Sequence, residues 1–167
     1  MPPLLFMGEE WGSTQPFPFF CDFQGDLAQA VRKGRREEFK AAYAKYGDEI
    51  PDPLAESTFK SAVLDWEARA TVAGSRRLAL VRDLLAVRHQ EIVPLLRDVT
   101  FGSAHVDGPV LSASWRLAGG RSLMLLANLS AEPARKPAKF TPERTIWGDA
   151  TGDDRLPWAV AWSLGTG

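Results

Sequence analysis

The chain has little of the chemistry that builds disulfide and metal sites. Its 167 residues include one cysteine and two histidines. A single cysteine, Cys21, cannot form an internal disulfide and is typical of a protein in a reducing compartment. One Cys and two His are also too few for a Cys/His zinc site. We therefore expect no disulfide framework and no metal, and nothing in the sequence implies a cofactor.

Excess charge of one sign and long apolar runs are lacking as well. The formal net charge is −1, so no surplus of Lys and Arg exists to neutralise the phosphates of a nucleic acid or an anionic membrane. The first apolar run ends at Gly8 with no basic segment before it, which excludes a signal peptide and a membrane span. Hydrophobic residues make up 45% and charged residues 25%, as in ordinary globular proteins. We expect a cytoplasmic protein.

The stretch that organises the rest of the chain lies at its start. Four apolar residues, Leu4 to Met7, follow a proline pair and predict a short strand buried on both faces. Gly8 ends the run, and Glu9, Glu10 and Trp11 follow at once. Polar and aromatic residues at the C-terminal end of a buried parallel strand are typical of an active-site edge. A strand that begins at residue 3 has no earlier strand to pair with, which predicts that the chain is the end of something larger.

Two helices are predicted next. The first begins at an Asp26 N-cap with Gln29 three residues on, weakens at Gly34, runs to about Tyr46 and ends at Gly47. Pro51-Asp52-Pro53 forms a rigid loop. Asp65-Trp66 is expected to cap the entry of the second helical region with a buried ring. The strongest helical pattern then runs from Ser75 to Pro94, with its apolar residues on one stripe.

Beyond Arg97 the pattern becomes strand-like. The stretches 110–117 and 122–128 flank Gly119-Gly120 and predict an antiparallel hairpin. Phe140, residues 145–147 and residues 158–162 add short strands. The expected core of this part contains the four tryptophans 115, 147, 158 and 162, whose alternative role is an accessory sugar-binding face. We place a domain boundary near residue 95.

Several residues are candidates for chemistry. Neighbouring residues in a strand point to opposite faces, so Glu9 and Glu10 cannot flank one scissile bond as a glycosidase pair does. One of them is expected to order a loop or a sugar hydroxyl while the other is structural, and the pattern leaves open which. Trp11, with Phe19 and Phe20, either stacks on sugar rings or packs the loop. Asp22 either binds hydroxyls or forms an Asx turn.

Three further residues are interpreted as structural. His89 is expected on a helix surface, and His105 in a Gly/Ser loop without partners. Asn128-Leu129-Ser130 matches a glycosylation acceptor, but a cytosolic chain would not meet the machinery, so a structural role is expected.

These spans resemble the alpha-amylase superfamily of glycoside hydrolases, and within it the malto-oligosyltrehalose trehalohydrolase family. The segment Leu4–Trp11 resembles the eighth strand of the family's barrel, and Phe19–Asp22 resembles the aromatic loop after it. Residues 52–66 resemble the segment before the family's last helix, and residues 80–95 resemble that last helix. The β tail, with Asn128–Ser130 and Leu156–Trp158, is similar to the C-terminal domain. The resemblance covers nearly the whole chain.

The resemblance implies an α+β fragment. Residues 1–94 would be the last βα unit and C-terminal end of a TIM (β/α)8 barrel, and residues 95–167 a small antiparallel β-sandwich. A complete barrel takes about 250 residues. The family's catalytic Asp, Glu and Asp lie on earlier strands whose motifs do not occur here, so no catalytic residue is expected within this chain.

The resemblance also implies an activity for the parent protein. It would cleave the α-1,4-glucosidic bond next to the trehalose unit of maltooligosyl trehalose by a retaining double displacement and release trehalose. Glu10 and Trp11 are the first candidates for substrate contact, followed by Glu9 and Asp22. The chain alone is expected to be inactive. Alternatives are a branching or debranching enzyme, or a noncatalytic carbohydrate-binding module.

Two partners follow from the same reading. The first is the N-terminal part of the barrel, whose strands would pair with residues 4–7. The second is another copy of the chain, because an unpaired strand edge invites association and a dimer through that edge is expected.

Overall fold

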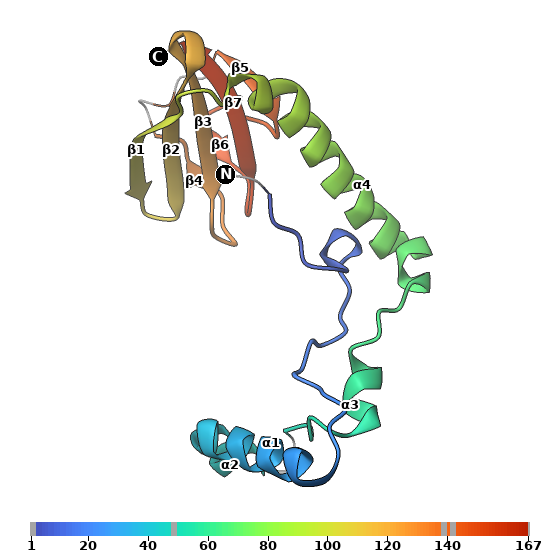
Figure 1. The fold of residues 1–167 in the computed structure, drawn as a ribbon. Coiled ribbons are helices and arrows are strands. Elements are labelled where there is room, and N and C mark those ends of the chain that lie inside the picture. The colour runs from blue at the N-terminus through green and yellow to red at the C-terminus, as the bar shows by residue number, and fades with distance from the viewer. Residues whose placement is uncertain (1–2, 48–49, 138–139, 141–142, 167) are drawn as a thin grey trace. The chain divides into compact units, whose positions relative to one another are not determined.

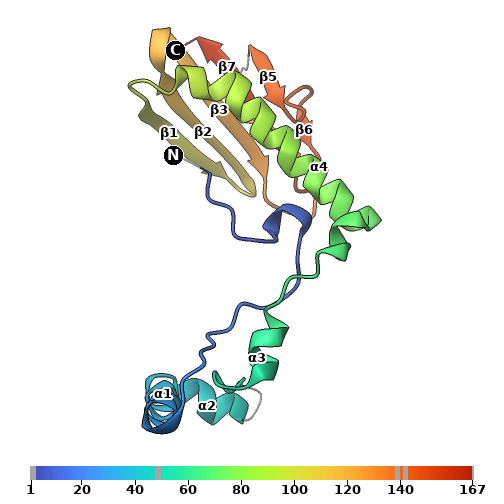
Figure 2. The same cartoon turned by 45° about the vertical axis from the view of Figure 1, so that its right-hand side comes forward.

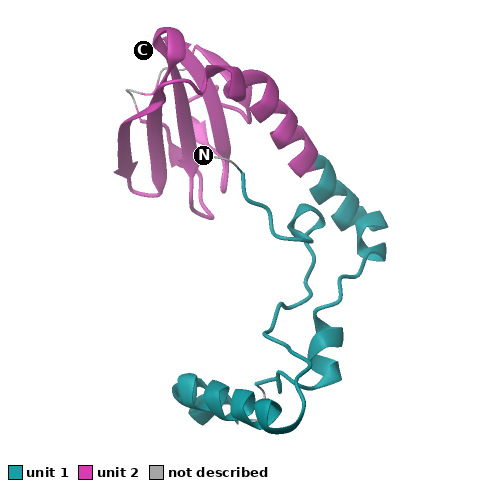
Figure 3. Cartoon of the chain, in the orientation of Figure 1, with its two compact units in different colours: residues 1–79 teal, residues 80–167 magenta. Residues whose placement is uncertain are grey.

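The computed structural model describes residues 3–47, 50–137, 140 and 143–166. The chain divides into two compact units, residues 1–79 and residues 80–167 (Figure 3). The first unit holds helices and extended segments, and the second is built on an antiparallel sheet (Figure 1). Among the described residues, none of the helices has both the length and the apolar character needed to span a membrane.

The predicted strand at Leu4–Met7 is not a strand in this structure. Residues 3–6 are extended coil, and the side chains from Leu4 to Met7 are all exposed, Leu4 at 94%. The physical reason is that a strand forms only beside a neighbouring strand that hydrogen-bonds to its N–H and C=O groups. Within the described residues the segment pairs with no strand.

The described part of the first unit contains short 3-10 turns and α-helices. The predicted helix over 26–46 forms as two helices that meet at Phe39, not at Gly34, and Gln24 rather than Asp26 is the N-cap residue of the first. Gly47 ends the second with a positive φ of 52°, as predicted. The elements are η1 (Glu9–Trp11), α1 (Gly25–Glu38), α2 (Lys40–Tyr46), α3 (Glu56–Ser61) and η3 (Glu67–Ala70).

The long helix α4 (Val72–Val87) begins earlier than predicted. The Thr71 hydroxyl accepts a hydrogen bond from the Gly74 N–H at 3.0 Å and so satisfies one amide of the first turn. The chain stays helical beyond α4, as a π-helical turn η4 (Arg88–Ile92) and a 3-10 turn η5 (Val93–Leu95). Pro94 therefore lies inside this last turn, where a missing N–H is tolerated. His89 is exposed, as expected.

The second unit is a five-stranded antiparallel sheet in the order β1-β2-β3-β7-β5 (Figure 2), with a separate two-stranded sheet β4-β6. The predicted hairpin is confirmed: β2 and β3 pair from Val110↔Asn128 to Leu117↔Arg121 around η6 (Ala118–Gly120), where Gly119 and Gly120 have positive φ. The other strands are β1 (Thr100–Asp107), β4 (Ala134–Arg135), β5 (Arg144–Trp147), β6 (Asp154–Arg155) and β7 (Val160–Thr166).

Strand β1 was missed, and the placement of His105 in a loop is therefore wrong. His105 pairs with Ser112 in the middle of the β1–β2 ladder. The strand lies at the sheet edge and all eight of its residues are exposed. An exposed edge strand with a bulge between Phe101 and Ser103 lacks the buried alternation by which strands are recognised in sequence.

Two apolar clusters lie in the sheet unit. One joins Val110, Leu126 and Ala161 of the sheet with Phe140 and Ala150 from the segment around β5. Phe140 is buried but not in a strand, contrary to the prediction.

The second cluster joins Leu117, Leu123 and Leu164 with the partly buried Ile92 and Leu95 of the helical turns, together with Trp115 and Trp162. The Trp115 and Trp162 rings stack at 5.7 Å. Three of the four tryptophans are at least half-buried, whereas Trp158 is 66% exposed and does not belong to the core.

Candidate functional site

The candidate site is the turn that follows the N-terminal segment. Gly8 and Gly12 bracket η1 with φ values of 91° and 74°, a left-handed conformation that favours glycine. The Ser13 N–H donates to the Gly8 carbonyl at 2.8 Å and closes the turn. The space above Gly8 is filled, since an added Cβ would lie 2.6 Å from the Cβ of Ser13. The sequence Gly-Glu-Glu-Trp-Gly thus folds as one tight loop.

Both carboxylates of this loop bind its own backbone. Glu9 Oε2 accepts the Phe6 N–H at 2.9 Å, and Glu10 Oε2 accepts the Gly8 N–H at 3.0 Å. Glu9 is exposed and Glu10 is half-buried. Each has a second carboxylate oxygen with no hydrogen bond recorded within the described part of the chain. The two acids hold the turn in shape, and each keeps one oxygen that can accept from a hydroxyl group.

Trp11 is the buried residue of the turn. Its side chain is 5% exposed, and its ring lies 5.0 Å from that of Trp66 at an angle of 39°. The Trp11 indole N–H is buried without a partner among the described residues. Trp66 is 52% exposed and carries the Arg69 guanidinium 4.9 Å from its ring centroid. The expectation of a buried Trp66 ring is therefore wrong: the exposed aromatic surface here belongs to Trp66.

Asp65 performs the capping role that the sequence predicts. Its Oδ1 accepts hydrogen bonds from the N–H groups of Glu67 and Ala68, at 3.0 and 3.3 Å, in the first turn of η3. This cap fixes the chain direction directly after Trp66 and so orients the indole over Trp11.

The aromatic loop packs through a chain of ring contacts. The rings of Phe6 and Phe17 meet edge to face at 4.9 Å, Phe17 contacts Phe20 at 6.5 Å, and Phe20 contacts Phe59 of α3 at 5.3 Å. Phe19 lies outside this chain, beneath the Arg35 guanidinium at 4.9 Å. The packing alternative therefore describes Phe20, while Phe19 keeps 49% of its surface exposed.

Asp22 is exposed, and no hydrogen bond of its side chain is recorded among the described residues, so the Asx turn is not seen there. The backbone beside it is fixed, because the Cys21 N–H donates to the Pro53 carbonyl at 2.9 Å. The four predicted site residues thus come from one loop and the segment after it. In residues 3–47, 50–137, 140 and 143–166, no three His, Cys, Asp or Glu side chains are placed to hold a metal ion.

Asn128 has the structural role that was expected. Its side chain is fully buried, and its amide N–H groups donate to the carbonyls of Glu132, Arg155 and Leu156 at 2.8, 3.2 and 3.0 Å. Its Oδ1 accepts from the backbone N–H and the hydroxyl of Ser130. A buried, fully hydrogen-bonded amide is not a modification site.

The chain is similar to known proteins over most of its length. The family described as a domain of unknown function (DUF3459) matches residues 100–162, the sheet part of the chain. A malto-oligosyltrehalose trehalohydrolase of Deinococcus radiodurans is 39% identical over 159 residues, which is 93% of this chain and 26% of that protein. One from Mycobacterium tuberculosis is 38% identical over 135 residues, 80% of this chain and 23% of that protein. The chain thus spans about a quarter of the length of these relatives.

Solved structures are also similar to this chain. A structure named as an alpha amylase from Salmonella typhimurium is similar with a TM-score of 0.82 and 36% identity over 98% of this chain and 28% of that one. A trehalulose synthase, MutB, matches with a TM-score of 0.55 at 16% identity over 98% of this chain and 35% of that one, which is a likeness of fold alone.

Proposed function

We propose that the chain is the C-terminal part of an enzyme of the alpha-amylase family that hydrolyses maltooligosyl trehalose, as its similarity to the malto-oligosyltrehalose trehalohydrolases suggests. The observation that carries this proposal is the 39% identity over 93% of the chain to a relative of that name. The bond cleaved would be the α-1,4-glucosidic bond next to the trehalose unit, with trehalose released. The names of the relatives favour this substrate over those of branching or debranching enzymes.

In this proposal residues 1–94 complete a (β/α)8 barrel and residues 95–167 form the C-terminal domain attached to it. The exposed apolar side chains from Leu4 to Met7 support a partner that covers them, and the neighbouring strands of the barrel are the partner proposed. A second copy of the chain would cover the same segment when the chain is alone. The reacting carboxylates of the retaining reaction then come from strands outside this chain.

The η1 turn supplies part of the rim of the substrate site. Glu10 and Glu9 each offer a free carboxylate oxygen to sugar hydroxyls while their other oxygen holds the loop. The buried Trp11 ring contacts Trp66 and supports it. The exposed aromatic surface of Trp66 is suited to the C–H face of a glucose ring. Asp22 lies at the end of the aromatic loop, where it is exposed and makes no side-chain hydrogen bond among the described residues. Its carboxylate accepts hydrogen bonds from sugar hydroxyl groups.

A chimera tests the proposal. Residues 1–167 replace the matching quarter of the Deinococcus radiodurans relative, and trehalose release from maltooligosyl trehalose is measured for the chimera, for the chain alone and for the relative with that quarter deleted. We expect release by the chimera only. Turnover by the verified chain alone would refute the fragment reading. A folded but inactive chimera would refute the assignment to this enzyme.

The same chimera tests the rim. Glu10→Gln keeps the size of the side chain and removes its charge, so we expect kcat/KM to fall about tenfold, as for loss of one charge-assisted hydrogen bond. Glu37→Gln, on the exposed face of α1, is the matched control and should leave kcat/KM unchanged. If Glu10→Gln and Glu37→Gln changed kcat/KM equally, Glu10 would not be a substrate-binding residue.

A further inference from the structure

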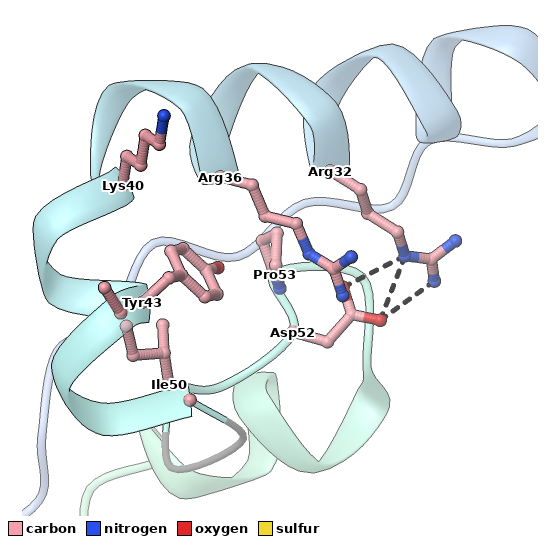
Figure 4. A pocket seen from close by; sticks show the side chains of 9 residues that line it. Arg32, Arg36, Lys40, Tyr43, Ile50, Asp52 and Pro53 are labelled. Atoms are coloured by element: carbon pink, nitrogen blue, oxygen red, sulfur yellow. Dashed lines mark hydrogen bonds and ion pairs between the residues drawn. The ribbon is translucent and has the colours of Figure 1, made fainter.

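A basic pocket lies in the first unit, between α1, α2 and the loop at 50–53 (Figure 4). Its volume is about 700 Å³, within the range of about 300–1,000 Å³ that is typical of small-molecule sites. Three cations line it at a spacing of four residues, which places them on one side of the helical stretch: Arg32, Arg36 and Lys40. We call this the α1–α2 pocket.

One anionic group already lies in this pocket and shows what it accepts. The Asp52 carboxylate receives the Nε–H of Arg32 at 3.0 and 3.2 Å, and Arg32 Nη2 lies 3.0 Å from Asp52 Oδ2. In Figure 4 the Arg36 guanidinium also points toward Asp52. The hydrogen bond from Arg32 holds the pKa of the Asp52 carboxyl below its ordinary value. Both side chains keep about 40% exposure, 39% and 42%, so a dissolved molecule can reach them.

Among the described residues, Asp52 is the one acid that lines the pocket, so the rest of the positive charge on this described lining is not neutralised. The neighbouring cations on α1 are paired elsewhere, Lys33 with Glu37 and Arg35 with Glu38. Within the described part of the chain, neither Arg36 nor Lys40 has an ion pair within 4.0 Å. Three cations against the one carboxylate of Asp52 leave a charge of +2 on the described lining, in a chain whose net charge is −1.

We propose that the α1–α2 pocket binds a small molecule that carries a phosphate group. A phosphate monoester has a charge of about −1.5 to −2 at neutral pH, which matches the charge of +2 on the described lining. A single carboxylate would neutralise only half of that positive charge. Arg36 offers the forked donor geometry that suits phosphate oxygens, and Lys40 adds a mobile ammonium group at the same wall. Asp52 keeps Arg32 in place and limits the pocket to one phosphate group.

The rest of the pocket is suited to the uncharged part of such a molecule. Tyr43 lies at the wall with its ring and phenol group, and Ile50 and Pro53 add apolar surface. The same three residues also line a smaller apolar hollow of about 210 Å³. Two unpaired cations are too few to hold a nucleic acid by its backbone, so a small ligand fits this site better. None of the residues proposed for the sugar site is among the described residues that line this pocket.

The test is a titration of the full 167-residue chain, labelled with 15N, by sodium phosphate and by glucose 6-phosphate. Sodium chloride at equal ionic strength and glucose are the reference titrations. We expect saturable shifts at Arg32 and Arg36 with either phosphate compound and with neither reference. Tighter binding of glucose 6-phosphate would assign the ligand to the sugar phosphates, and equal binding would assign it to free phosphate. Shifts that chloride reproduces would overturn the proposal.

Charge variants locate the binding. Arg36→Gln with Lys40→Gln should weaken phosphate binding at least about tenfold, since two charge-assisted contacts are lost. Lys33→Gln with Lys45→Gln removes the same charge outside the pocket and should change the affinity less than about twofold, the effect of charge alone. Arg36→Lys, which keeps the charge and the helix, should weaken binding severalfold through loss of the fork. Equal weakening by both Gln pairs, or tighter binding of a Glu-rich peptide than of either phosphate compound, would reject the site.

Discussion

Arg144 of β5 holds both carboxylate oxygens of Glu91, 53 residues earlier in the chain. Its Nη1 lies 3.1 Å from Oε1 and its Nη2 lies 2.5 Å from Oε2. Glu91 belongs to the π-helical turn η4, whose neighbour Ile92 packs on the sheet. This forked ion pair therefore joins the turn η4 to the edge strand β5. It lies beside the apolar contact that Ile92 makes with the sheet.

The Arg144–Glu91 pair predicts an acid-sensitive part of stability. The hydrogen bond from Arg144 lowers the pKa of Glu91 below its ordinary value. The stabilisation is therefore present at pH values above the ordinary Glu pKa and is lost as the pH falls through the lowered one. We expect Glu91→Gln to lower the melting temperature slightly at neutral pH, because both side chains are partly exposed, and to have no effect at a pH below the lowered pKa. Thermal melts across this range, with Lys33→Gln as control, measure it; a difference independent of pH would contradict it.

Asn128→Ala is expected to destabilise the sheet unit by about 2–4 kcal/mol. The change leaves three buried or half-buried carbonyls and the Ser130 hydroxyl without the amide that they bind, and each unsatisfied group carries a desolvation cost. Urea unfolding followed by tryptophan fluorescence gives the value. Leu129→Ala, at a neighbouring side chain that is 56% exposed, is the control and should change stability little. Equal losses for the two variants would show that the amide network is not the cause.

Two helical glycines are expected to respond in opposite directions to alanine. Gly34, inside α1, has open space where a Cβ would lie, so Gly34→Ala should stabilise the helix by about 0.5–1 kcal/mol. At Gly74, in the first turn of α4, a Cβ would meet the Ala68 carbonyl oxygen at 2.0 Å. Gly74→Ala should therefore move the backbone and destabilise the first unit. Urea unfolding of the two variants side by side measures both, and a gain in stability at Gly74 would contradict the packing described here.

The exposed N-terminal segment should make the isolated chain associate. Leu4 and Met7 are 94% and 51% exposed, and they lie within four consecutive exposed apolar residues. Light scattering after size exclusion is expected to show a mass that rises with concentration, and Leu4→Ser with Met7→Ser should lower it toward the monomer. Val72→Ser, at a single apolar side chain that is 87% exposed, is the control. A monomer at every concentration would contradict this prediction.

Local patterns sufficed for the elements whose partners lie nearby in the chain. The β2–β3 hairpin follows from alternation around Gly119-Gly120, and the end of α2 follows from Gly47. The cap at Asp65 follows from residue type and position. Each of these depends on hydrogen bonds or turn conformations within a few residues, which sequence patterns record directly.

The tertiary structure decided what depends on distant partners. It exposed Trp66 and buried Trp11 against it, placed Arg32 and Arg36 near the Asp52 carboxylate from another segment, and left Trp158 outside the core. Among the residues that it describes, the structure also gives Leu4–Met7 no strand partner, although the apolar pattern alone specifies a strand. Periodicity in the sequence indicates which side chains should be buried. Only the folded chain shows which residues bury them, because burial depends on contacts between segments and not on any one segment.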